Sequence, residues 1–242
     1  MSAVALYGPK PEPVLGMLGS IQALIAEHTG ASFLPYSLEQ IHATLIAFNG
    51  VRDPASGAIV NEYFLEHTGT GRTMDIDLAM RILTERFARP LRVRAGGYRP
   101  GDPVPFRSRG QHLYQRTFSV QGDAFVLVGW PASAGALSDR RPLDRLRRDL
   151  NAAGLLHRYH ARGDDIDGDL HLVVGHHRGA PDDALSAAVS AVRDELAGHP
   201  VEFDVAIGDV RVVAADNHTL APPLYVGPVP ADASTVLALT GA

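Results

Sequence analysis

Two short runs of the sequence begin with a histidine and continue as alternating residues of a strand: His42-Ala43-Thr44-Leu45 and His171-Leu172-Val173-Val174. Residues two apart in a strand point to the same face, about 6.6–7 Å apart. At that spacing the His42 imidazole can move a proton while the Thr44 hydroxyl donates a hydrogen bond to the same phosphate. Taken alone, the first run is more typical of a structural histidine. The second histidine, on a matching strand, favours an acid–base pair.

Hydrophobic periodicity predicts the elements that would position these residues. Short apolar or alternating runs predict strands over residues 3–7, 41–48, 91–94, 125–128, 170–175, 201–212 (with a kink at Gly208) and 224–226. Helical spacing with capping signals predicts helices over residues 15–30, 76–87, 142–154 and 182–198. Residues 49–73 and 98–116 are expected to be loops.

Strict alternation within residues 41–48 predicts which side chains share the face of the first histidine. Ile41, Ala43, Leu45 and Ala47 should lie on one face, and His42, Thr44, Ile46 and Phe48 on the other.

The order of elements repeats along the chain. Each half is expected to contain a strand, a helix, a histidine-bearing strand, a helix and a further strand, and the two histidines lie 129 residues apart. We therefore predict an α/β (α+β) fold, with residues 1–242 forming one two-lobed domain. The approximate lobes are residues 1–116 and 117–242, and strands could exchange between them. If a pseudo-twofold axis relates the lobes, the histidines face each other across one cleft.

Composition narrows the class of protein. The 242 residues are 45 % hydrophobic and 20 % charged, which is typical of a globular protein. Because there is no cysteine, disulfides, thiolate nucleophiles and cysteine-ligated metals are excluded. We find no signal peptide and no apolar run of about 18 residues, so we expect a cytoplasmic protein without a membrane partner. No obligatory protein partner is evident.

Charge is spread unevenly, although the net charge is only −5. Residues 72–162 hold seventeen arginines against eight acidic residues, and residues 163–242 hold three arginines against thirteen. This distribution does not fit a general nucleic-acid coat protein, which would be basic throughout. The arginine-rich third could line an anion-binding cleft, or it could form solvated helix faces paired with the acidic third.

With these motifs, the chain resembles the 2H phosphoesterase superfamily, which includes the LigT-like proteins and RNA 2′,3′-cyclic phosphodiesterases. Its members carry two motifs of the form His, apolar, Thr or Ser, apolar. His42-Ala43-Thr44-Leu45 matches completely, whereas the second run has Val173 where Thr or Ser belongs. The resemblance covers the whole chain in element order, and its motifs are four residues long. It implies a duplicated two-lobed fold with two antiparallel sheets flanking a central cleft and helices outside.

The resemblance further implies His42 and His171 as a catalytic acid–base pair and Thr44 as a phosphate ligand, with no metal and no cofactor. The implied function is a metal-independent phosphodiesterase (a hydrolase) acting on a 2′,3′-cyclic phosphate, an RNA end or a cyclic nucleotide. Val173 cannot donate a hydrogen bond, and a lost bond to a charged group costs about 1–3 kcal/mol. The alternative is therefore a nucleotide- or RNA-end-binding protein of the same fold with little catalysis. A third possibility is an unrelated two-lobed protein with structural histidines.

Other patterns favour structural roles. His176 and His177 are expected in a surface loop rather than on a metal, because no regular carboxylate partner accompanies them. The acidic stretch Asp164, Asp165, Asp167 and Asp169 lacks the order of a calcium loop, and residues 69–73 lack a Walker lysine. No G-x-S-x-G sequence occurs. The remaining candidates are aromatic residues that could stack on bases but are more typical of packed element ends: Tyr36, Tyr114 and Tyr225.

Overall fold

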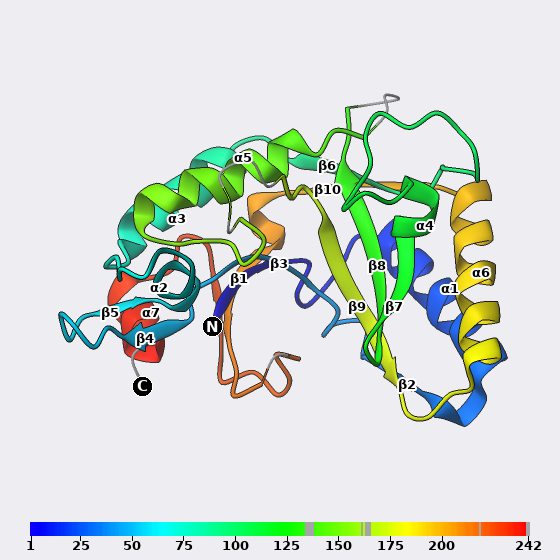
Figure 1. Cartoon of the computed structure of the whole chain (residues 1–242), viewed down its shortest axis with the longest axis horizontal. Helices are drawn as coiled ribbons and strands as arrows, with labels where there is room; N and C mark the ends of the chain where they lie inside the picture. The colour runs from blue at the N-terminus through cyan, green and yellow to red at the C-terminus, as the bar shows by residue number, and fades with distance from the viewer. Residues whose placement is uncertain (134–137, 161, 163–165, 218, 241–242) are drawn as a thin grey trace.

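The computed structural model describes residues 1–133, 138–160, 162, 166–217 and 219–240. Its strands form two main sheets and a small hairpin (Figure 1). The first sheet has the order β12 (Tyr225–Pro228), β11 (Val210–Ala214), β1 (Ser2–Ala5) and β3 (Ala43–Ala47). The second has the order β10 (Val201–Val205), β6 (Leu91–Ala95), β8 (Ala124–Pro131), β9 (Leu170–His177) and β2 (Phe33–Pro35), and β7 (Phe118–Gln121) also pairs with β8. The hairpin is β4 (Gly50–Arg52) and β5 (Ile59–Asn61).

All pairings between these strands are antiparallel. Together with the helices they confirm the predicted α+β class. The sheets do not divide the chain at residue 116. β11 and β12 join the sheet of β1 and β3, whereas β2 and β6 join the sheet of β8 and β9. Both sheets therefore contain strands from both halves of the sequence.

Seven α-helices occur in the described residues: α1 (Glu12–Thr29), α2 (Glu62–Thr68), α3 (Ile76–Arg86), α4 (Leu113–Thr117), α5 (Arg141–Asp149), α6 (Asp182–Gly198) and α7 (Ala233–Thr240). Helices α1 and α6 lie side by side, α1 against β10 and β2 and α6 against β7, and α3 and α5 lie together at the upper left of the view (Figure 1). The predicted stop at Gly30 is observed, because this glycine takes a positive φ of 55° directly after α1.

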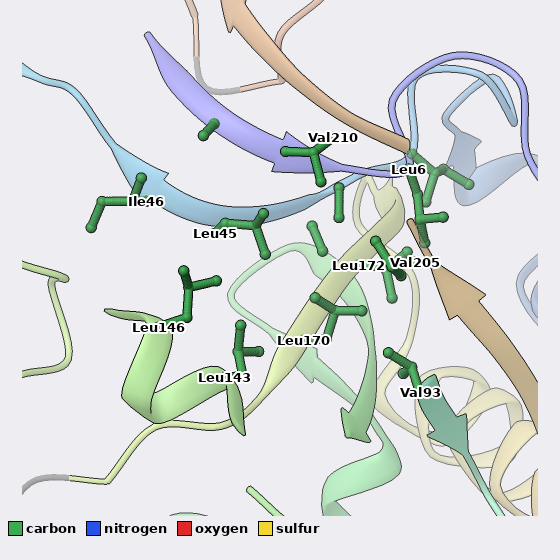
Figure 2. Packing of buried hydrophobic residues seen from close by; sticks show 14 of the residues in the cluster. Leu6, Leu45, Ile46, Val93, Leu143, Leu146, Leu170, Leu172, Val205 and Val210 are labelled. Atoms are coloured by element: carbon green, nitrogen blue, oxygen red, sulfur yellow. The ribbon is translucent and has the colours of Figure 1, made fainter. Parts of the chain in front are cut away.

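Apolar side chains from both sheets and from α5 meet in one core (Figure 2). Leu45 of β3 and Leu170 and Leu172 of β9 are fully buried there, and Leu143 and Leu146 of α5 pack beside them. Because residues alternate along a strand, burying one face of β3 and β9 turns their histidine-bearing faces away from this core.

Several short elements were not predicted. The expected loop at residues 49–73 contains β4, β5 and α2, and the expected loop at 98–116 ends in α4. β2, β7 and α7 are also additions to the predicted elements. Strands of three or four residues are too short for periodicity to reveal, because their pairing is decided by neighbours far along the chain.

Candidate functional site

One cavity of about 630 Å³ is lined by the four motif residues that were predicted to share a site, His42, Thr44, His171 and Val173. Thr44 reaches the cavity from β3, and His42 reaches it from the position directly before β3. His171 and Val173 reach the cavity from β9. Each of the four is partly exposed, while their neighbours Ala43 and Leu172 are fully buried. The alternation of each strand thus turns its motif into the cavity.

A β-bulge changes the phase of β3 within this wall. In the pairing with β1, Ala3 lies opposite Ile46 and Val4 lies opposite Thr44, so Leu45 is the extra residue. The predicted alternation therefore holds as far as Thr44 and is wrong after it, since Ile46 does not share the face of His42. Ile46 is buried, and Ala47 lines the cavity instead. A bulge inserts one residue and shifts every following side chain to the opposite face.

β9 has a bulge at the corresponding position. Val126 lies opposite Val173 and Phe125 opposite Gly175, so Val174 is the extra residue. Both bulges lie three residues after the motif histidine, and the next cavity-lining residue lies five after it: Ala47 on β3 and His176 on β9. The two strands therefore repeat a local irregularity as well as a motif.

His176 and His177 are thus part of β9 and not of a surface loop, which corrects the prediction. Both pair with β2, since Leu34 lies opposite His176 and Phe33 opposite His177. The Tyr36 hydroxyl lies 2.6 Å from His176 Nε2, and His176 Nδ1 lies 3.2 Å from an Asp123 carboxylate oxygen. Tyr36, His176 and Asp123 form the β2 end of the cavity wall.

The surroundings of His42 set its proton position. Its Nδ1 lies 2.7 Å from the carbonyl oxygen of Gln40 and donates to it, which leaves Nε2 with the lone pair. Burial lowers the pKa of His42 below its ordinary value of 6.5. The bond to Gln40 opposes this shift, and the charge of Lys10 adds to it. His42 is therefore neutral, with a basic nitrogen, near pH 7.

His171 has charged neighbours of both signs. Its Nε2 lies 2.6 Å from an Arg116 guanidinium nitrogen and 3.4 Å from an Asp169 carboxylate oxygen. Burial lowers the pKa of His171, the hydrogen bond and charge of Asp169 raise it, and Arg116 lowers it. The net shift is downward. A rearrangement that favours Asp169 over Arg116 would stabilise the imidazolium.

Asp169 connects His171 to the interior. Its carboxylate accepts hydrogen bonds from the Ser108 hydroxyl at 2.7 and 2.8 Å, from the Trp130 indole at 2.7 Å and from Arg116 at 3.1 Å. Burial alone would raise the pKa of Asp169, but the bond and charge of His171, with Ser108 and Arg116, hold that pKa well below its ordinary range. Asp169 is a fixed carboxylate behind His171.

Arg147 of α5 ties together the strands that carry the two motifs. Its guanidinium donates to the carbonyl oxygens of Thr44 and Leu45 on one side and of Asp167 and Asp169 on the other, at 3.0–3.3 Å. The side chain is 2 % exposed and forms part of the cavity wall. Because four carbonyls occupy its donors, Arg147 serves to position the strands.

Residues 157–159 form a further wall of the cavity. The Tyr159 ring lies edge-on to His171, with 6.2 Å between ring centroids. Arg158 is exposed, lies 5.0 Å over the Tyr159 ring and lines the cavity. His157 is buried beside Arg147, and burial followed by that charge lowers its pKa well below 6.5. Arg158 is thus a cation that can reach a ligand here.

Arg116, Asp169 and Arg147 were not predicted as parts of the site. For Asp169 a signal exists, because it lies two residues before His171 and strand alternation places both on one face. Arg116 and Arg147 give no comparable signal. They lie 55 and 103 residues from their partners His171 and Thr44, and only the folded chain brings them together.

The remaining sequence candidates lie outside the cavity or outside the described residues. Asp164 and Asp165 lie outside the described residues. Gly69 ends α2 with φ 70°, and the N-terminus of α3 is capped by Asp75. The Tyr114 hydroxyl donates to Asp194 on α6, and Tyr225 belongs to β12. Within the described chain, His, Asp and Glu form no group of three that could hold a metal ion.

None of the described helices combines the length and the apolar character needed to span a lipid bilayer.

Comparison with known proteins reveals a distant structural likeness. No protein family model matches the chain, and no curated protein does. The crystal structure of the protein TT0787 of Thermus thermophilus is similar over 96 % of this chain and 100 % of its own, with 15 % sequence identity and a TM-score of 0.39. A likeness of that size carries no argument about function.

Proposed function

We propose that this chain is a metal-independent phosphodiesterase that hydrolyses a 2′,3′-cyclic phosphate, at an RNA end or in a small cyclic nucleotide. The observation that carries the proposal is the shared cavity of His42, Thr44 and His171, approached from two strands with matching bulges. Two imidazoles and a hydroxyl around one cavity provide a base, an acid and a phosphate ligand.

In this proposal His42 is the general base. Its Nδ1–H is committed to the Gln40 carbonyl, so the lone pair of Nε2 is the one that can accept a proton. Water attacks phosphorus and forms a new P–O bond, and its proton moves to His42 Nε2. One P–O bond to a ribose oxygen breaks, and that oxygen takes a proton from His171.

His171 is assigned as the acid because Asp169 lies behind it. A fixed carboxylate 3.4 Å from the ring nitrogen stabilises the imidazolium form that an acid requires. Arg116 opposes that form, since it occupies the same nitrogen. An anionic phosphoryl group in the cavity adds negative charge and shifts the balance toward protonated His171.

Phosphate binding would rest on Thr44 and on Arg158. Val173 lines the cavity at the position that matches Thr44 but has no hydroxyl. Arg158 is exposed and lines the same cavity, and a guanidinium contacts phosphate with two parallel hydrogen bonds. We infer that Arg158 compensates for the hydroxyl that Val173 lacks.

The direct experiment is to incubate the protein with 2′,3′-cyclic nucleotides and with RNA ending in a cyclic phosphate, in the presence of a chelator. We expect conversion to a phosphomonoester that His42→Ala abolishes. His28→Ala, a matched change of an exposed histidine on α1, should leave the rate unchanged. No turnover of any of these substrates, or equal turnover by His42→Ala, would contradict the proposal.

A second candidate is a protein that binds nucleotides or RNA ends without turnover. Val173 favours it, because one of two expected phosphate ligands is missing, and so does Arg116, which holds the reactive nitrogen of His171. Saturable binding of a 2′,3′-cyclic nucleotide that survives His42→Ala, together with no hydrolysis, would select this function.

A further inference from the structure

A second cavity, of about 480 Å³, lies beside Arg116. It is lined by three arginines and by polar side chains, and none of the described residues that line it is acidic. The lining residues are Arg109, Gln111, Gln115, Arg116, Ser119, Val120, Gln121 and Arg193. A concave surface with three guanidinium groups and amide donors has the chemistry that binds an oxyanion.

Arg116 is the best-placed of these groups. It is 4 % exposed, and one guanidinium nitrogen contacts Asp169 and His171. Its Nε is buried and has no hydrogen-bond partner among the described residues. Buried donors are almost always paired, and leaving one unpaired costs about 1–3 kcal/mol. An oxyanion in the cavity that Arg116 lines would add an acceptor for this guanidinium group.

The backbone holds the other two arginines in place. Arg109 has a positive φ of 49° in the turn between Ser108 and Gln111, which bond to each other through their backbones. Such a conformation is costly for a residue other than glycine, and costly conformations cluster at ligand sites. The turn places the Arg109 guanidinium 3.8 Å over the Tyr159 ring.

Arg193 of α6 is fixed by two bonds of its own. Its guanidinium donates to the carbonyl oxygens of Phe118 at 2.8 Å and Gln115 at 2.7 Å. These bonds hold its charge at the cavity before a ligand arrives, so little side-chain entropy remains to be lost on binding.

We propose that this second cavity is a binding site for a phosphate-type oxyanion, separate from the cavity of His42. The proposal rests on the arginines and not on the chemistry proposed for the histidines. Arg116 lines this cavity and also contacts His171, so the bound anion would influence the first cavity through one side chain.

The chain contains its own reporter for this site. Trp130 is its only tryptophan, and the indole donates to the same Asp169 carboxylate that Arg116 contacts. The test is a titration with inorganic phosphate at constant ionic strength, following the Trp130 indole N–H resonance by NMR, with sodium chloride as the reference salt. We expect a saturable shift with phosphate and none with chloride, and we expect it to persist in His42→Ala.

The phosphate affinity of Gln115→Glu distinguishes binding in the second cavity from binding elsewhere, because Gln115 lines the second cavity. Gln115 is exposed and lines the second cavity, so the change adds one negative charge without disturbing the core. We expect about fivefold weaker phosphate binding, which is the upper range for one exposed charge pair. Ser20→Glu, an exposed site on α1, is the charge-matched control and should bind as the unmodified protein does. A shift that does not saturate, or an equal affinity in Gln115→Glu, would overturn the proposal.

Discussion

At the scale of single residues, the two motifs place side chains of nearly equal size but different chemistry at their third position. Thr44 and Val173 occupy equivalent positions on β3 and β9, and both line the cavity. The hydroxyl of Thr44 can bind a phosphoryl oxygen, and the matching methyl of Val173 cannot. The site is thus built from a symmetric backbone with asymmetric chemistry.

Val173→Thr should therefore increase activity. A hydrogen bond to a charged group is worth about 1–3 kcal/mol, so kcat/KM for a 2′,3′-cyclic nucleotide should rise about tenfold. Steady-state kinetics measure the gain. Val126→Thr, which changes the residue opposite Val173 on β8, is a matched control that should give no gain. An unchanged kcat/KM in Val173→Thr would show that this position does not contact the phosphoryl group.

The pH dependence of activity follows from the directions in which the pKa values of His42 and His171 are shifted. The base must be neutral, and burial lowers the pKa of His42 below 6.5, so activity should already rise below pH 6.5. The acid must be protonated, and the lowered pKa of His171 makes activity fall again as pH increases. We expect a bell-shaped profile of kcat/KM centred below pH 6.5. A single inflection, or a maximum above about pH 7.5, would contradict this pairing.

At the scale of elements, the site depends on how α5 joins β3 to the segment before β9. Arg147 donates to two carbonyls of β3 and to the carbonyls of Asp167 and Asp169, and it lies 3.4 Å from the Asp167 carboxylate. Removing one partner of a buried ion pair leaves the other charge uncompensated.

Arg147→Met should destabilise the fold by about 3–5 kcal/mol. Arg147→Lys should reduce the free energy of unfolding by less, because lysine keeps the positive charge. It should still destabilise the fold, because lysine replaces only part of the hydrogen bonding. Urea unfolding followed by Trp130 fluorescence measures both. Arg81→Met, an exposed position on α3, is the control and should stay within about 0.5 kcal/mol of the unmodified protein. An equal midpoint for the Arg147 and Arg81 variants would refute the bridging role.

Helices and strands also differ in how well the sequence predicts them. The longer helices and most of the apolar strands follow from periodicity, and the stops at Gly30 and Gly154 follow from glycine at positive φ. The single strand expected over residues 201–212 is wrong, because β10 and β11 are separate strands that lie in different sheets. The bulges at Leu45 and Val174 do not follow from periodicity, because a bulge is a property of the pairing with β1 or β8 and not of the local sequence. For the same reason the place of His176 on the cavity wall was missed.

Strand alternation predicts that His42 and Thr44 share one face and that His171 and Val173 share another, and the expectation that both pairs meet in one cavity rests on the repeated order of elements and on the family resemblance. Their roles in catalysis stay predictions. Arg116 could not be predicted as a partner of His171, because it reaches His171 through α4, and α4 is a short helix in a segment without periodicity.

At the scale of the whole molecule, the two halves of the sequence are interleaved. The final strands β11 and β12 complete the sheet that carries β3, and β2 and β6 complete the sheet that carries β9. Each of the two sheets that carry the motifs is thus made by strands from both halves of the chain. The relative position of the two histidines is fixed by the fold as a whole.

The most direct test of the central claim is a double-mutant cycle with His42→Ala and His171→Ala, measured as single-turnover hydrolysis of a 2′,3′-cyclic nucleotide. If both imidazoles act on one phosphorus atom, each single variant should lose about 10²–10⁴-fold in rate, and the double variant should lose no more than the worse single one. Full activity in either single variant would contradict the claim, and so would losses that simply multiply in the double variant.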